Sequence, residues 1–104
     1  KIVFVSAQGG AQNVWVMLAD GSSPAQLTDT GGNNVDPSWS PDGTQIAFAS
    51  DRGGTAELYV MNADGSNVQQ ITFDLNIGGR NDWSNDGRWL TFYAGGAGAR
   101  HDCA

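Results

Sequence analysis

Three adjacent residues near the end of the sequence, His101, Asp102 and Cys103, belong to the types that carry out nucleophilic catalysis. Catalytic groups of this kind are brought together by the fold and need an ordered scaffold. The segment that contains them, residues 95–104, is rich in glycine, and no strand rule would select it. We expect an irregular tail there, and we therefore predict no catalytic residue and no enzymatic activity.

Aspartate-glycine pairs offer carboxylate oxygens, the ligands that calcium prefers. The chain has four of them: Asp20-Gly21, Asp42-Gly43, Asp64-Gly65 and Asp86-Gly87. In the segment Asn62-x-Asp64-Gly65-Ser66-Asn67 the glycine comes two positions too early for a calcium loop. Because the pair recurs along the chain, turn formation is the favoured interpretation. No metal-ligand spacing occurs elsewhere, so we predict no metal and no cofactor.

The four tryptophans could form a surface on which sugars stack, or they could pack inside the fold. Trp39 and Trp83 lie 44 residues apart, and Trp15 lies 44 residues before Tyr59. Aromatic residues that recur at a fixed interval are expected to pack between repeated units. Trp89 aligns with Gln45, so its ring is not a property of the repeat. Trp89 is therefore a candidate for contact with a partner.

The repeat is centred on the stretch from Asp36 to Gly43, in which Pro41-Asp42-Gly43 has the residues of a tight turn between two strands. The same design returns 44 residues later at Trp83. A fixed period in the forties with several short strands per unit is typical of a propeller blade. Other residues at this offset are Ile2, Ile46 and Leu90; Phe4, Phe48 and Phe92; Met17 and Met61; Leu27-Thr28 and Ile71-Thr72.

The fold class predicted is all-β, with blades of four antiparallel strands and a 44-residue repeat. The whole chain, 1–104, forms a single partial β-propeller domain of about nine strands, or two and a quarter blades. Its units are 1–35 (incomplete), 36–79 (complete) and 80–104 (incomplete). Strands are expected at 1–6, 13–19, 25–28, 36–40, 45–50, 57–62, 67–73, 82–84 and 88–94.

Loops between the second and third strands and the crossings between blades should emerge on one face, where recognition residues are usually found. The two crossings differ from each other although the strands repeat, which indicates a site. Ordinary loop drift, or an ion pair between Asp36 and Arg80, is the favoured explanation of the difference, and a site is the alternative. The candidate binding residues are Asn33, Asn34, Asp36, Arg52, Asn76, Arg80 and Trp89.

Composition limits the partners. A formal net charge of −6 repels phosphate backbones, so nucleic acid is not expected as a partner. No apolar run approaches the roughly 20 residues that span a bilayer, so no membrane span is expected. The single cysteine cannot form an internal disulfide, and stability must come from packing.

The motif Pro37-x-Trp39-Ser40-Pro41-Asp42-Gly43, followed by Ile46-Ala47-Phe48-x-Ser50-Asp51-Arg52-x-Gly54, resembles the repeat of TolB-type β-propellers. The propeller domains of prolyl-oligopeptidase-like peptidases share this repeat. The central repeat matches throughout, whereas Asn81 and Asn85 stand where the pattern has prolines. The resemblance implies a bacterial, periplasmic or secreted setting, and a role in holding protein partners or gating a substrate.

Propellers close with about four to eight blades, so further blades must come from more of the same chain or from a homo-oligomer, for which a trimer is one arrangement. The chain begins within a repeat, and we expect a fragment of a longer propeller. Three functions remain open: a scaffold that binds proteins, the substrate-gating propeller of a serine peptidase, and a small oligomeric carbohydrate-binding propeller. The second requires a Gly-x-Ser-x-Gly segment in a separate domain.

Overall fold

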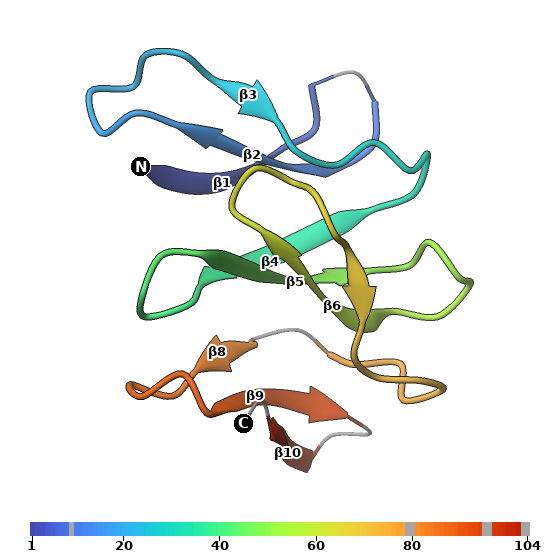
Figure 1. Cartoon of the computed structure of the whole chain (residues 1–104). Coiled ribbons are helices and arrows are strands. Elements are labelled where there is room, and N and C mark those ends of the chain that lie inside the picture. Colours follow the sequence, from blue (N-terminus) through green and yellow to red (C-terminus); the bar gives the residue numbers. More distant parts are fainter. Residues whose placement is uncertain (9, 79–80, 95–96, 103–104) are drawn as a thin grey trace.

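The computed structural model describes residues 1–8, 10–78, 81–94 and 97–102. These residues contain ten β-strands and no helix, and the strands form three antiparallel sheets. Figure 1 shows the three sheets stacked one upon another in the order of the sequence. The all-β propeller architecture expected from the repeat is confirmed.

Each sheet follows the chain without crossovers. The strands are β1 (Ile2–Ser6), β2 (Asn13–Met17) and β3 (Ala25–Gln26) in the first sheet; β4 (Asn34–Trp39), β5 (Gln45–Ser50), β6 (Glu57–Asn62) and β7 (Gln69–Gln70) in the second; and β8 (Asp82–Trp83), β9 (Trp89–Ala94) and β10 (Ala97–Asp102) in the third.

The turn between β4 and β5 forms as its residue types dictate. The amide of Gly43 donates to the carbonyl of Ser40 at 2.9 Å, and Gly43 has a φ of 73°, which a side chain would oppose. The Asp42 carboxylate accepts hydrogen bonds from the Ser40 hydroxyl at 2.7 Å and from the amide and hydroxyl of Thr44. The turn thus satisfies its own polar groups and fixes the register of β4 against β5.

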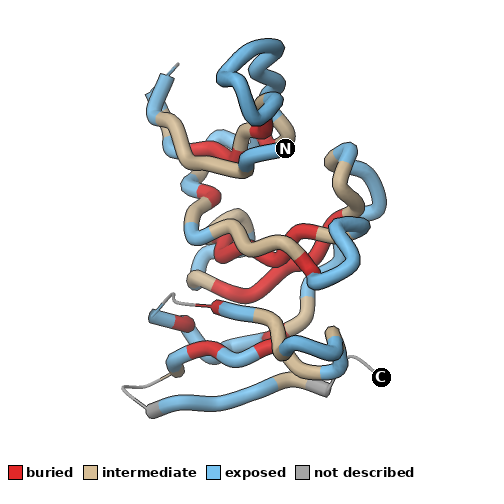
Figure 2. The backbone as a smooth tube through the Cα atoms, turned by 90° about the vertical axis from the view of Figure 1, so that its left-hand side faces the viewer, coloured by how far each residue is buried: buried red, intermediate tan, exposed pale blue. Residues whose placement is uncertain are grey.

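Two apolar clusters hold the stack together, one at each junction between sheets. Alternate side chains of a strand point to opposite faces, so the second sheet contributes to both clusters. Figure 2 shows that buried residues concentrate in this middle sheet. The first cluster contains Val14, Val16, Ile46, Phe48, Tyr59 and Met61, and the second contains Ala47, Ala49, Leu58, Val60, Ile77, Leu90 and Phe92.

Trp39 packs against the first cluster and Trp83 against the second. The predicted packing role of these two repeated tryptophans is confirmed. Trp15 stacks on Phe4 with ring centroids 6.4 Å apart. The same stack recurs one repeat later, where Tyr59 lies 5.9 Å from Phe48.

The irregular tail predicted for residues 95–104 is wrong for residues 97–102, which form β10 and pair with β9 along their whole length. In the second sheet Ser50 pairs with Glu57, and in the third the equivalent Ala94 pairs with Ala97. Ala94 therefore lies 44 residues after Ser50, but Ala97 lies only 40 residues after Glu57. The connection between β9 and β10 is four residues shorter than that between β5 and β6. A strict 44-residue offset placed the strand too late.

Smaller differences concern strand limits. β4 begins at Asn34, two residues earlier than predicted, and its register shifts between Val35 and Ser38, where Asp36 has a φ of 55°. The outer strands β3 and β7 are only two residues long, because each pairs with its neighbour at just two positions. The proposed unit limits at 35/36 and 79/80 stay predictions. Cys103 lies outside the described residues.

Candidate functional site

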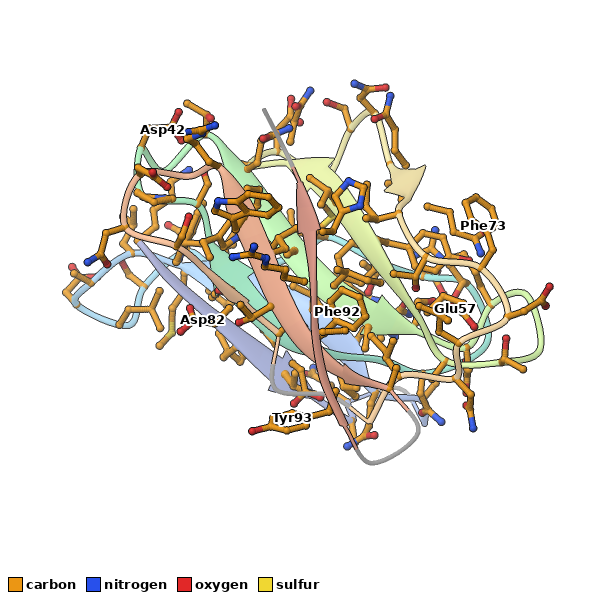
Figure 3. The ribbon with its side chains drawn as sticks, turned by 90° about the horizontal axis from the view of Figure 1, so that it is seen from below. Asp42, Glu57, Phe73, Asp82, Phe92 and Tyr93 are labelled. Carbon is orange, nitrogen blue, oxygen red and sulfur yellow. The ribbon has the colours of Figure 1, made fainter. Side chains whose placement is uncertain are left out.

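The loop between β5 and β6 and the crossings between sheets lie at one end of the stack, which we call the rim (residues 27–34, 51–56 and 71–78). In Figure 3 Glu57, beside this loop, and Asp42, at the β4–β5 turn, lie at opposite ends of the sheets. The rim brings together four of the predicted site residues. They are Asn33, Asn34, Arg52 and Asn76.

Asn33 joins the first crossing to the loop through Asp51. The Asn33 backbone amide donates to Asp51 Oδ1 at 2.7 Å, and its side-chain amide donates to Oδ2 at 3.4 Å. In return, the Asp51 backbone amide donates to the Asn33 carbonyl at 3.2 Å. Asn33 itself is exposed. This arrangement fixes the loop conformation and leaves the Asn33 side chain at the surface.

Asn34 is fully buried, with 0% of its surface exposed. Its side-chain amide donates to Asn13 Oδ1 at 3.0 Å and to Thr30 Oγ1 at 3.1 Å. Asn13 Oδ1 also accepts from the hydroxyl of Thr28 at 2.9 Å. A buried polar group that is hydrogen-bonded on all sides orders its neighbours. Asn34 therefore positions the rim and does not present a contact surface.

Arg52 lies across this network. Its Nε donates to Ser50 Oγ at 2.9 Å, and one terminal nitrogen donates to Asn34 Oδ1 at 3.1 Å. The guanidinium carbon lies 4.6 Å from the ring centre of Tyr59 and 5.4 Å from that of Phe48. Burial lowers the pKa of Arg52, and Tyr59 acts in the opposite direction. The two rings hold the cation in a partly desolvated position.

Only two of the five guanidinium N–H groups of Arg52 are used by these bonds. Among the residues that the structure describes, the other three have no acceptor. A planar guanidinium with open N–H groups is suited to a carboxylate or a backbone carbonyl. Arg52 is thus the rim side chain best placed to bind a partner.

Sequence reasoning missed Glu57, which holds the second crossing. Its side chain is 2% exposed. The carboxylate accepts hydrogen bonds from the hydroxyls of Thr72 (2.7 Å) and Thr55 (2.8 Å) and from the amides of Asn76 (3.0 Å) and Leu75 (3.1 Å). Burial raises the pKa of Glu57, but these bonds outweigh it, and the pKa lies below its ordinary value.

A signal for Glu57 was present in the repeat. Glu57 stands 44 residues after Asn13, and Thr72 stands 44 residues after Thr28. In both sheets the threonine hydroxyl donates to the polar side chain, so the pair is a repeated device for anchoring the crossing. Asn76 completes the second anchor, since its Oδ1 accepts from the amide of Ala56 at 3.3 Å.

The remaining predicted residues lie apart from this network. Asp36 is exposed within β4, and its carbonyl accepts a hydrogen bond from the Asn81 side chain at 2.8 Å. Arg80 lies outside the described residues, so its ion pair with Asp36 stays a prediction. Trp89 is in β9, next to the turn at Ser84 and away from the rim, and Arg100 lies over its ring at 4.1 Å.

The acidic turns, at Asp20, Asp42, Asp64 and Asp86, use their carboxylates in hydrogen bonds within the turn. In each turn a serine hydroxyl donates to the aspartate, and this bond is the main cause that lowers the pKa of the carboxyl. Within the described ranges no three His, Cys, Asp or Glu side chains gather as a metal site would require. In the same part of the chain no helix is present that could cross a bilayer.

Stacked antiparallel sheets that repeat along the chain define this protein as a segment of a β-propeller. The model of the TolB beta propeller domain matches residues 1–102, and the chain belongs to this family. The structure of putative TolB from Agrobacterium tumefaciens is similar with a TM-score of 0.81 and 27% identity, over 88% of this chain and 33% of that one. TolB from Acinetobacter baumannii is similar with a TM-score of 0.77 and 23% identity, over 96% and 26%.

A further similar structure is the acylaminoacyl peptidase of Pyrococcus horikoshii, with a TM-score of 0.60 and 27% identity over 78% of this chain and 12% of that one. The chain thus spans a third or less of each of these three proteins. No curated protein matches the sequence significantly. The resemblance to TolB-type and peptidase propellers inferred from the repeat is confirmed.

Proposed function

We propose that this chain is a non-catalytic propeller segment that binds a protein partner through its rim, as part of a periplasmic or secreted protein. The observation that carries the proposal is Arg52, whose guanidinium is held on Tyr59 and bonded to Asn34 while three N–H groups stay open. Arginine and aromatic residues in ordered surroundings dominate the binding energy of protein interfaces.

The rim is also rigid enough to serve recognition. Asp51 fixes the first crossing and Glu57 fixes the second, so little conformational entropy is lost when a partner binds. Membership of the TolB beta propeller domain family supports both the scaffold role and the envelope setting.

A photo-crosslinking scan tests this function. A crosslinking residue replaces the exposed Asn33 or Asn76 at the rim, or the exposed Asn85 at the opposite end as a matched control. Each protein is irradiated in an envelope extract of the organism whose gene encodes this chain, and products are identified by mass spectrometry. We expect one crosslinked protein shared by both rim positions and absent from Asn85. Equal labelling from both ends, or none from the rim, would contradict the proposal.

A second candidate is the substrate-gating propeller of a serine peptidase. It is favoured by the similarity to an acylaminoacyl peptidase, of which this chain covers 12%. In that case the native gene continues into a hydrolase domain with a Gly-x-Ser-x-Gly segment. Sequencing the gene on both sides of the region that encodes this chain distinguishes the two candidates. The carbohydrate-binding alternative would require saturable glycan binding.

A further inference from the structure

The second crossing carries two large apolar side chains at the surface of the rim. Phe73 is 65% exposed and Leu75 is 43% exposed. The sheets before and after this crossing, β4–β7 and β8–β10, are both present in the structure, so the exposure of these side chains does not result from a missing adjacent sheet. In Figure 3 Phe73 lies beyond Glu57, at the end of the sheets opposite Asp42.

The fold itself does not require apolar residues at these two positions. The residues 44 positions earlier, in the first crossing, are Asp29 and Gly31, and both are exposed. Phe73 and Leu75 are not members of the two apolar clusters that hold the described sheets together. Adjacent large apolar side chains that lie exposed without a role in the core indicate an interaction surface.

The backbone that carries this apolar pair is fixed in one conformation. Asp74 and Asn76 have φ of 57° and 50°, in the left-handed region that residues other than glycine seldom adopt. The buried Glu57 carboxylate accepts hydrogen bonds from the amides of Leu75 and Asn76 and secures this conformation. Backbone of this kind is concentrated at binding sites. Phe73 and Leu75 are therefore presented on a preorganised segment, which reduces the entropy lost on binding.

The loop between β5 and β6 connects the apolar pair to the Arg52 guanidinium. Its last residue, Ala56, is bonded to the second crossing: the Ala56 amide donates to Asn76 Oδ1 at 3.3 Å, and the Ala56 carbonyl accepts from the amide of Ile77 at 2.8 Å. Because Arg52 and Ala56 are four residues apart, their Cα atoms lie at most about 15 Å apart. An extended segment of about eight residues covers about 27 Å, which is enough to reach from Arg52 to Leu75.

Two glycines keep the surface between these points free of side chains. A Cβ at Gly53 would come no closer than 3.8 Å to its nearest neighbour, the hydroxyl of Tyr59, and a Cβ at Gly54 would meet nothing within 4 Å. Glycine allows another backbone to approach closely. A partner segment can therefore lie across this loop.

Charge determines which kind of segment fits. The three open N–H groups of Arg52 are suited to a carboxylate, which can accept two parallel hydrogen bonds from a guanidinium. The chain as a whole has a formal net charge of −6, and Asp29 and Asp74 are exposed at the rim. A segment rich in acidic residues would be repelled. The rim thus matches a segment with a single carboxylate and apolar residues.

We propose that the rim binds one extended segment of its partner, in which a single carboxylate contacts Arg52 and a large apolar side chain, several residues away, packs on Phe73 and Leu75. This inference rests on the protein-binding function proposed above and specifies the chemistry of the partner. The carboxylate comes from an aspartate or glutamate side chain or from the end of the partner chain.

Selection from peptide libraries tests this inference. Random octapeptides are displayed on phage in two formats, one internal and one with a free C-terminus, and are selected on the folded chain. We expect the internal library to yield peptides with one acidic residue separated from a large apolar residue by about three to six positions. If the carboxylate is that of a chain end, the second library yields the apolar residue at a fixed distance from the C-terminus instead.

The dissociation constant of the selected peptide is then compared with that of the same peptide carrying an amide in place of the carboxylate. The amide should bind about tenfold more weakly to the unmodified chain, and the two peptides should bind equally to Arg52→Ala. This comparison changes the peptide rather than the protein, so it does not depend on how well Arg52→Ala folds.

Two variants of the protein test the rest of the path. Phe73→Ser should weaken binding about tenfold, and Gly53→Leu should weaken it by placing a side chain under the peptide. Neither should lower the melting temperature, because Phe73 is exposed and a Cβ at Gly53 meets no close neighbour. Val68→Ser is the matched control, since Val68 is 38% exposed and lies outside the rim.

The inference is overturned if neither library is enriched, if the enriched peptides lack the paired carboxylate and apolar residue, or if Phe73→Ser and Gly53→Leu bind as the unmodified chain does. Any of these results leaves the proposed function standing as long as the crosslinking scan captures a protein at the rim. Failure of that scan, in contrast, contradicts the proposed function itself.

Discussion

The indole nitrogen of Trp83 donates a hydrogen bond to the backbone carbonyl of Ser38, 3.0 Å away, and so joins β8 of the third sheet to β4 of the second. The side chain of Asn81 makes a second bond of this kind, to the carbonyl of Asp36. Asp36 lies within the irregular part of β4, and Ser38 is the residue at which the regular register resumes. Adjacent sheets are therefore held together by directed polar bonds as well as by apolar packing.

The bond from Trp83 predicts the effect of Trp83→Phe. Phenylalanine retains most of the apolar contact but leaves the Ser38 carbonyl without its donor, so the free energy of unfolding should fall by about 1 kcal/mol. Urea denaturation measures this change. Trp89→Phe is the control, because it keeps an aromatic ring beneath Arg100. An equal loss in both variants would mean that the bond contributes nothing.

Gly65 and Gly21 form a matched pair for testing the contact between the first two sheets. Both have a left-handed backbone, with φ of 88° and 86°, so alanine at either position costs about 1 kcal/mol. A Cβ at Gly65 would also lie 3.2 Å from the carbonyl oxygen of Leu27, whereas at Gly21 it meets open space. Gly65→Ala should therefore lower the urea midpoint more than Gly21→Ala. Equal midpoints would show that the Leu27 carbonyl moves aside without cost, and would contradict a tight contact between the two sheets at this point.

The lowered pKa of the buried Glu57 carboxyl leads us to expect that the stability of the fold depends on pH. Its pKa in the folded state lies below the ordinary value of 4.5, because hydrogen bonds from Asn76, Thr72, Thr55 and Leu75 favour the carboxylate. Its stabilising effect is therefore present above about pH 4.5 and is lost as the pH falls through the folded-state pKa.

Glu57→Gln removes this contribution. The variant should lose about 1.5–3 kcal/mol of stability at pH 7, and below pH 4.5 its stability should depend less on pH than that of the unmodified chain. The measurement is the free energy of unfolding at several pH values. Asp29→Asn, at an exposed position, is the control for the removal of one carboxylate. Parallel pH curves for Glu57→Gln and the unmodified chain would exclude the anchoring role.

Much of the fold could be predicted from the sequence, because the residues that repeat are those that make the turns and the core. Asp42 and Gly43 build their turn from local hydrogen bonds, so it depends on little else. The strand β10 could not be found by the same offset, since a hairpin loop shorter by four residues shifted it. Gly95-Gly96 between two runs was a signal for a short hairpin.

The site was less accessible to sequence reasoning. Divergent crossings drew attention to Asn33 and Asn34, but the sequence could not tell that one is exposed and the other buried. That distinction depends on Asn13, a residue from the preceding sheet, which accepts a hydrogen bond from Asn34. Contacts between distant segments are set by tertiary packing and leave no local pattern.

The most direct test of the central claim is the dissociation constant of the partner captured at the rim. It is measured for the unmodified chain, for Arg52→Ala and for Asp42→Asn, with each variant first shown to be folded by circular dichroism. If the rim binds through Arg52, Arg52→Ala should weaken binding about tenfold or more, and Asp42→Asn, at the opposite end, should leave it unchanged. Binding that survives in Arg52→Ala and weakens in Asp42→Asn would place the interaction surface at the end opposite the rim, and would contradict the proposed function.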